Sequence, residues 1–343
     1  MMKRRSLVFI AILFILLSGC NNDAEANESD EHAGKSFNRE SVESHIYYPL
    51  TGLQANLEPT NRIVSVMVNN HPAARPQTGL SKADIVFEIL AEGQTTRFLA
   101  MFHSEVPEVV GPVRSARPYY FNLANDYNAL YVYHGAANFI EDMLRAGAAD
   151  HLNGAYYDND GNLFKRESFR VAPHNSYLQF NAVADVAINQ GYQMEASYQS
   201  LDFLTAEEIS ELQGEAATDI SLMYGQESVR YLYDEPAEKY LRFSAGQQTI
   251  ELTDETPIQL DNVFIIETTH QVVDQEGRRE VDLQSGGNAL LLQKGQLQRI
   301  QWENQGGRLI PVREGEPVGL VPGQTWVNVI PTDPGLSGVT GLE

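Results

Sequence analysis

Short apolar runs rich in β-branched residues recur along the chain from residue 62 onward, and such runs predict buried strands. In the first half they cover residues 62–68, 84–90, 97–103 and 129–134. The second and third are separated by Glu92-Gly93-Gln94-Thr95, whose glycine suits a tight turn. These two runs therefore predict a hairpin.

Polar residues and prolines between the runs mark helix starts. The predicted helices are 119–127 after Pro118, 139–145 after Asn138, a segment from Asn175 or Ser176 to about Gln190, and a short helix opened by a capping box of Thr205 and Glu208. Ser81 followed by Asp84 also permits a helix over 85–90. The near-continuous apolar run there favours the strand.

Beyond about residue 220 the pattern changes to strands separated by Gly and Asp-Asn turns. The predicted strands are 229–233, 239–243, 263–267, 289–293, 298–302, 308–311 (antiparallel to 298–302) and 325–330. Trp302 and Trp326 lie on two of them, as core residues or, less commonly, as a surface for sugars or a partner.

These elements predict a mixed α/β (or α+β) fold. We expect an N-terminal mixed-sheet domain with helices and a smaller β-rich C-terminal domain. The expected segments are 46–200 for the first domain, 201–220 for a bridging helix or linker, 221–332 for the second domain and 333–343 for a tail.

The first 45 residues have a different composition. Basic residues 3–5, an apolar stretch at 7–17 and the run Leu17-Ser18-Gly19-Cys20 have the layout of a lipoprotein signal peptide, with cleavage after residue 19. Lipid on Cys20, such as palmitate, would then hold the protein at the extracellular face of the cell membrane. Residues 20–45 are polar and acidic, which is typical of a flexible tether.

Charge and cysteine content exclude several classes of function. The formal net charge is −22, and loss of the three basic residues 3–5 would bring it to −25, so nonspecific nucleic-acid binding is disfavoured. With Cys20 as the only cysteine, neither an intrachain disulfide nor a thiolate metal site can form. No nucleotide-binding fingerprint or zinc motif occurs, and the 158–162 run suits a turn better than a calcium loop, so we expect neither cofactor nor metal.

Arg114, Ser115 and Arg117 form the densest polar cluster, just before the helix that starts at Pro118. Two guanidinium groups beside a positive helix end suit phosphate, sulfate or carboxylate. Each arginine could instead cap a carbonyl or pair with an acid.

Asn69, Asn70, His71 and Arg75 follow the first predicted strand, and residues that leave the end of a strand commonly line binding sites. A structural turn would also explain their amide groups. Arg97 could join the same site, or pair with Glu88 across the hairpin.

His134 and His174, the latter followed by Asn175, lie just before predicted helices. Either imidazole could serve as a general acid or base if it lay beside the arginines, which would stabilise developing charge. Alternatively, each ring is a hydrogen-bonding residue of the fold.

Five polar strings resemble those of the YerB-type lipoproteins, a largely uncharacterised family of bacterial envelope proteins. They are Val68-Asn69-Asn70-His71-Pro72, Ala74-Arg75-Pro76-Gln77, Gly111-Pro112-Val113-Arg114-Ser115-Ala116-Arg117, Ala172-Pro173-His174-Asn175 and Pro322-Gly323-Gln324-Thr325-Trp326. The resemblance covers roughly residues 48–332. It implies two domains and carries no established reaction.

We therefore expect a non-enzymatic, membrane-anchored lipoprotein. Its partner would be an anionic envelope component, such as a cell-wall polymer, or a wall-synthesis protein. The alternative is a hydrolase or transferase that acts on phosphate-bearing or glycan polymers, with His134 or His174 as base. A purely structural scaffold is the third possibility.

Overall fold

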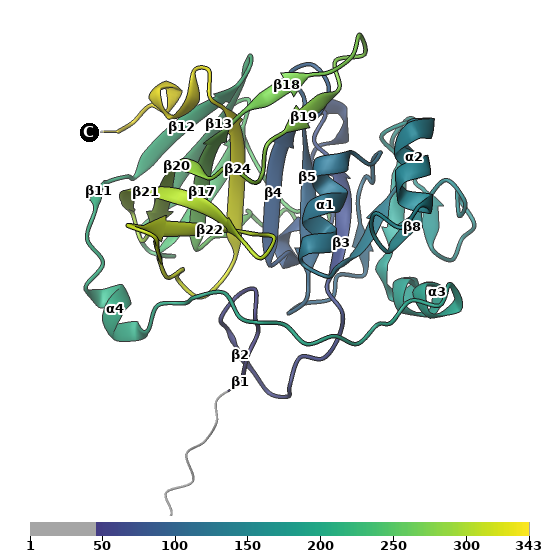
Figure 1. Cartoon of the computed structure of the whole chain (residues 1–343), viewed down its shortest axis with the longest axis horizontal. Coiled ribbons are helices and arrows are strands. Elements are labelled where there is room, and N and C mark those ends of the chain that lie inside the picture. The colour runs from purple at the N-terminus through teal and green to yellow at the C-terminus, as the bar shows by residue number, and fades with distance from the viewer. Residues whose placement is uncertain (1–45, 343) are drawn as a thin grey trace, which may run out of the picture. The chain divides into compact units, whose positions relative to one another are not determined.

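A large mixed sheet runs through the molecule and takes strands from both halves of the sequence (Figure 1). The computed structural model describes residues 46–342, which belong to one compact unit. The predicted signal peptide, Cys20 and the tether lie outside the described residues.

Twelve strands of the described chain form this sheet. Across it they are β23 (Glu316–Pro317), β22 (Arg308–Arg313), β21 (Gln296–Gln305), β20 (Gly287–Gln293), β17 (Asn262–Thr268), β24 (Thr325–Pro331), β4 (Ile85–Leu90), β5 (Thr96–Phe102), β3 (Val64–Asn69), β7 (Leu130–Tyr133) and β8 (His151–Asn153), with β11 (Glu215–Ala216) beside β21.

The middle of the sheet joins the two halves of the chain. Strand β24 lies between β17 and β4 and runs parallel to both. Strands from either side of the predicted 201–220 linker therefore share one hydrogen-bonded sheet. Strand residues outnumber helical ones, at 41% against 14%, so the expected mixed α/β character is matched only in part.

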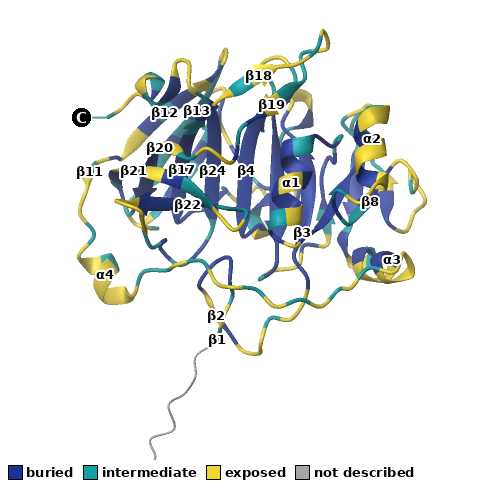
Figure 2. Ribbon diagram, in the orientation of Figure 1, coloured by how far each residue is buried: buried dark blue, intermediate teal, exposed yellow. Residues whose placement is uncertain are grey.

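Each face of the sheet is covered, as Figure 2 shows by the burial of its central strands. Helices α1 (Pro118–Asp126) and α2 (Asn138–Arg145) pack on one face. A smaller sheet made of β12 (Asp219–Tyr224), β13 (Glu227–Asp234), β14 (Lys239–Ser244), β15 (Gln247–Gln248) and β16 (Gln259–Leu260) packs on the other. Strand β3 illustrates the alternation, because Val66 belongs to the second interface and Met67 to the first.

The remaining elements lie around these layers. They are β1 (Ile46–Tyr47), β2 (Gln54–Ala55), β6 (Val109–Val110), β9 (Phe164–Arg166), β10 (Ser176–Gln179), β18 (His270–Val272), β19 (Arg279–Val281), α3 (Val183–Asn189), α4 (Ala206–Ser210) and the 3₁₀ turns η1 (Pro72–Ala74), η2 (Leu80–Lys82), η3 (Phe180–Ala182) and η4 (Gly335–Gly338).

Most local predictions are confirmed. Residues 85–90 are a strand, and β4 and β5 form the expected antiparallel hairpin. Helix α1 begins at Pro118, and Thr205 and Glu208 make a complete capping box. Trp302 and Trp326 are fully buried, so both are core residues.

The helix predicted from Asn175 or Ser176 to Gln190 is wrong in its first half. Ser176–Gln179 forms β10, which pairs with β6 and β9, and α3 begins only at Val183. Tyr177 and Leu178 are buried in this small sheet. Tertiary burial therefore outweighs the local start signal.

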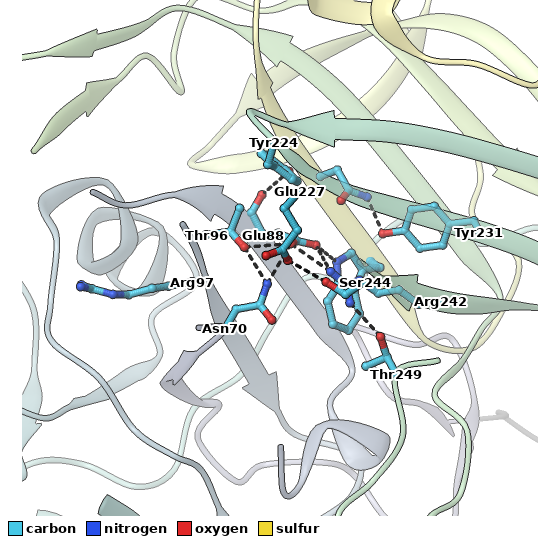
Figure 3. A network of polar contacts seen from close by, with 12 residues as sticks. Asn70, Glu88, Thr96, Arg97, Tyr224, Glu227, Tyr231, Arg242, Ser244 and Thr249 are labelled. Carbon is cyan, nitrogen blue, oxygen red and sulfur yellow. Dashed lines mark hydrogen bonds and ion pairs between the residues drawn. The ribbon is translucent and has the colours of Figure 1, made fainter. Parts of the chain in front are cut away.

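A fully buried ion pair connects the two sheets (Figure 3). Glu88 of β4 and Arg242 of β14 are 0% and 1% exposed, and their charged atoms lie 2.9 and 3.0 Å apart. Thr96 and the indole of Trp326 donate to the same carboxylate. Every carboxylate oxygen is thus satisfied, which a buried charge requires.

The predicted pairing of Arg97 with Glu88 is wrong. In the hairpin register Glu88 lies opposite Phe98, and Arg97 lies opposite Ile89. Successive side chains of a strand point to opposite faces, so the two charges lie on different faces of the sheet.

Replacing Arg242 by Ala should lower the free energy of unfolding by about 3–5 kcal/mol, because the Glu88 carboxylate would stay buried without its counter-ion. Urea denaturation measures this loss. Arg230→Ala is the matched control, because Arg230 and Asp219 form a surface ion pair in which the two side chains are 42% and 50% exposed. Breaking that pair should lower the free energy of unfolding by no more than about 1 kcal/mol. Equal losses in the two variants would contradict a central role for the buried pair.

Candidate anion-binding site

Several predicted polar residues meet where the parallel strands β3, β7 and β8 end. Asn69 is the last residue of β3, and His134 directly follows β7. Arg97 lies opposite Asn69, because β5 runs antiparallel to β3. The carboxyl ends of parallel strands are the usual place for ligands in such sheets.

Arg114 lies between these strand ends. Its backbone N–H donates to Met67 of β3, and its carbonyl accepts from the N–H of His134. Its guanidinium is half-buried and has neither hydrogen bond nor ion pair within residues 46–342. Burial, and secondly the charge of Arg97, lower the pKa of Arg114 to about 10. The side chain is therefore a cation that lacks a counter-ion in the part of the chain that the structure describes.

His174 is held as a neutral hydrogen-bond donor. The Oδ1 atom of Asn69 accepts the backbone N–H of His71, so its Nδ2 atom must face the Nδ1 atom of His174, at 2.9 Å. That Nδ1 atom accepts, and the ring proton is on Nε2. Burial, then His71 and Arg114, lower the pKa of His174.

His71 has the same proton arrangement. Its Nδ1 atom accepts from the N–H of Ala73 at 3.1 Å, which leaves the proton on Nε2. The rings of His71 and His174 stack with their centroids 4.6 Å apart. Two Nε2–H donors thus belong to one stacked pair.

His134 has the opposite tautomer. Arg166 lies 3.4 Å from its Nε2 atom, and because a guanidinium only donates, that nitrogen must accept. The Nδ1–H then donates to the hydroxyl of Ser176 at 2.7 Å. Burial is the main reason why the pKa of His134 is lowered. The charges of Arg166 and Arg114 also lower it, and Asp158 opposes them.

We call Asn69, His71, Arg114, His134, Arg166 and His174 the Arg114 cluster. Positive charge predominates around it. Arg166 is paired with Asp158, whereas Arg170 donates only to oxygens of Ala74, Pro76 and Tyr177 and has no acidic partner among the described residues. In a chain of net charge −22, this local excess of cations favours an anionic ligand.

Two of the predicted anion-binding arginines are already paired with an acid. Arg97 and Arg117 both pair with Glu92 of the hairpin turn, Arg97 at 2.7 Å. Arg97 also donates to the carbonyl of Ser115, whose side chain makes no hydrogen bond with other described residues. Arg114 and Arg117 therefore differ, because only Arg114 is left without an acid.

Asn70 belongs to the buried network of Figure 3, and Arg75 is hydrogen-bonded to it. The amide of Asn70 donates to Glu88 and Thr96, and its carbonyl oxygen accepts from Arg75. Arg75 also pairs with Glu227 of β13. Their polar groups connect the two sheets and do not face the Arg114 cluster.

Sequence reasoning missed three members of the site region. Asn175 was predicted, but its partner Arg166, which donates to it at 2.9 Å, was not. The sequence indicates Ser176 only as a helix cap and gives no role to Arg170. Arg166 lies close in sequence to the predicted polar residues His174 and Asn175, which is a weak signal in the sequence. Its position in space depends on the pairing of β9 with β10, which the sequence does not show.

The 158–162 run forms a turn, as predicted, in which one carboxylate oxygen of Asp160 accepts three backbone N–H groups. Within residues 46–342, no three His, Cys, Asp or Glu side chains gather as metal ligands would.

Two family models match this chain. One is described as the N-terminal domain of a protein of unknown function, DUF3048, and matches residues 50–193. The other is the C-terminal domain of the same family and matches residues 219–327. The "Putative lipoprotein YerB" of Bacillus subtilis (strain 168) is 44% identical over 288 residues, which cover 82% of this chain and 86% of that protein.

The chain belongs to the YerB-type family. The fold agrees, because the crystal structure of the YerB protein from Bacillus subtilis matches with a TM-score of 0.79 at 42% identity. That match covers 86% of this chain and 98% of the solved one. The resemblance drawn from the five polar strings is therefore confirmed.

None of the helices in the described part of the chain is long and apolar enough to cross a membrane.

The proton positions in the Arg114 cluster can be measured directly. We expect the ring of His174 to carry its proton on Nε2 and that of His134 on Nδ1, with both rings neutral at pH 7. Their pKa values are lowered, so each ring should reach half-protonation only below the ordinary value of 6.5. Long-range ¹H–¹⁵N spectra across a pH titration report both properties. Titration of either ring above pH 6.5 would contradict the described contacts.

Proposed function

We propose that this protein is a lipid-anchored envelope protein that binds an anionic group of an envelope component at the Arg114 cluster. The observation that carries the proposal is the half-buried guanidinium of Arg114, which has no counter-ion among the described residues. A buried cation without a partner destabilises the fold, so its presence is accounted for if a ligand supplies the negative charge.

The histidines support binding more than catalysis. A general base needs a free lone pair within reach of the substrate. The lone pair of His174 accepts from Asn69, and that of His134 faces Arg166. The Nε2–H groups of His71 and His174 are donors instead, as an anion requires. The contacts of these histidines therefore do not support the alternative of a hydrolase or transferase.

A lipid on Cys20 would place this site in the cell envelope. The similarity to a protein named as a lipoprotein and the Leu17-Ser18-Gly19-Cys20 run support the anchor. An anionic cell-wall polymer is then the component that we favour. A wall-synthesis protein would need to present a carboxylate or phosphate to the same cations.

Cys20→Ala should move the protein from the membrane fraction to the soluble or secreted fraction and abolish labelling by a radioactive fatty acid. Cell fractionation with immunoblotting measures the first change. Ser18→Ala is a control that keeps a small residue at the cleavage site and should leave the protein on the membrane. Membrane retention of the Cys20 variant would contradict the anchor.

Arg114→Gln should weaken the binding of inorganic phosphate at least about 10-fold, since a charge-assisted hydrogen bond contributes about 1.5–3 kcal/mol. The same change should leave the free energy of unfolding equal or higher, because it removes an unpaired, half-buried charge. Calorimetric titration and urea denaturation measure the two effects.

Two control variants separate binding from folding. Arg299→Gln, on β21, breaks an exposed pair with Glu215 and should change neither quantity appreciably. Arg117→Gln removes one of the two arginine partners of Glu92 and should lower stability instead. Unchanged phosphate affinity in Arg114→Gln, or no measurable phosphate binding by the parent protein, would refute the proposed site.

A further inference from the structure

A loop of residues 167–175 borders the Arg114 cluster. Its two ends are joined, because the N–H of Glu167 donates to the carbonyl of Asn175 at 2.9 Å. His174 and Asn175, at the end of this loop, contact Asn69 and Arg166 of the cluster. The loop therefore leads directly into the anion-binding groups.

The loop presents apolar side chains to water. Phe169 is 59% exposed and Val171 is 81% exposed. Exposed apolar groups beside a polar site commonly mark a surface that binds a ligand.

The loop is also held in place. Arg170 donates to the carbonyl oxygens of Ala74 and Pro76 and, at 2.8 Å, to the hydroxyl of the buried Tyr177. The ring of Phe169 lies 5.8 Å from that of Tyr177 and 5.5 Å from the Cζ atom of Arg170. Phe169 is thus supported on one side while more than half of its surface stays free. A supported ring costs little entropy when a ligand packs on it.

We propose that the ligand of this site is a sugar unit that carries a phosphate group. This inference rests on the proposed anion site and specifies its ligand. The phosphate would accept hydrogen bonds from Arg114 and from the Nε2–H groups of His71 and His174. A sugar ring has apolar C–H faces and polar edges, so one face would pack on Phe169 while its hydroxyl groups stay in water.

The arrangement of the apolar side chains favours a sugar over a lipid chain. An acyl chain gains its binding energy from continuous apolar burial. Phe169 is instead flanked by Ser168 and Arg170, and Arg170 separates it from Val171. Such isolated aromatic rings suit a ligand that is itself apolar only in part.

The test compares three probes on the full mature chain: inorganic phosphate, glucose 1-phosphate and vesicles that contain phosphatidylglycerol. We expect glucose 1-phosphate to bind about 10-fold more tightly than inorganic phosphate, a difference of about 1.4 kcal/mol. Phe169→Ala should remove this preference without changing the affinity for inorganic phosphate. Phe169→Tyr should keep the preference.

The controls distinguish this inference from the anion site itself. Val272→Ala, which changes an exposed apolar residue on β18, should leave all three affinities unchanged. Folding of each variant is checked by its urea denaturation midpoint. If Arg114→Gln loses affinity for both inorganic phosphate and glucose 1-phosphate, the anion site is supported. That conclusion does not depend on the result for Phe169→Ala, which tests only the sugar.

Three outcomes would overturn the proposal of a sugar phosphate ligand. The first is equal affinity of the parent protein for glucose 1-phosphate and inorganic phosphate, and the second is a preference for glucose 1-phosphate that survives Phe169→Ala. The third is vesicle binding that Phe169→Ala abolishes while no preference for glucose 1-phosphate exists, which would assign a lipid headgroup as the ligand.

Discussion

The structure depends on a charge placed where no water reaches it. Glu88 lies at the centre of the large sheet, and its carboxylate is satisfied by Arg242, Thr96 and Trp326. These partners come from a different sheet, from the next strand of the hairpin and from the last strand of the chain. Burial of the carboxylate is tolerable only when all of them are in place, so the pair requires both sheets and both halves of the chain to pack in one register.

The ion pairs inside the protein determine which polar residues are available to bind a ligand. Asn70 and Arg75 are used to connect Glu88 and Glu227, and Arg97 and Arg117 are used by Glu92. Arg114 lies near enough to Arg97 for that charge to add to burial in lowering its pKa, but it has no acidic partner among residues 46–342. The site is therefore a cation beside a set of satisfied ion pairs, and this contrast supports a role in binding.

Local chemistry was enough to predict much of the fold. Gly93, Pro118 and the Thr205–Glu208 box act through their own backbone conformation or nearest neighbours, so each could be recognised in the sequence. Ser176 could not, because the burial of Tyr177 and Leu178 between β6 and β9 decides its strand. The difference between Arg114 and Arg117 was equally hidden, since it depends on Glu92, which the hairpin brings near from another part of the chain.

The position of β24 also constrains how the chain can fold. Its hydrogen-bonding partners are β17 and β4, and β4 lies some 240 residues earlier in the sequence. Until residues 325–331 arrive, both partners expose an unpaired edge in the middle of the sheet, and such edges promote aggregation. A chain that emerges from its N-terminus onward would thus have to keep its first half protected until its last strand is delivered. Folding then depends on contacts between residues far apart in the sequence, so we expect it to be slow.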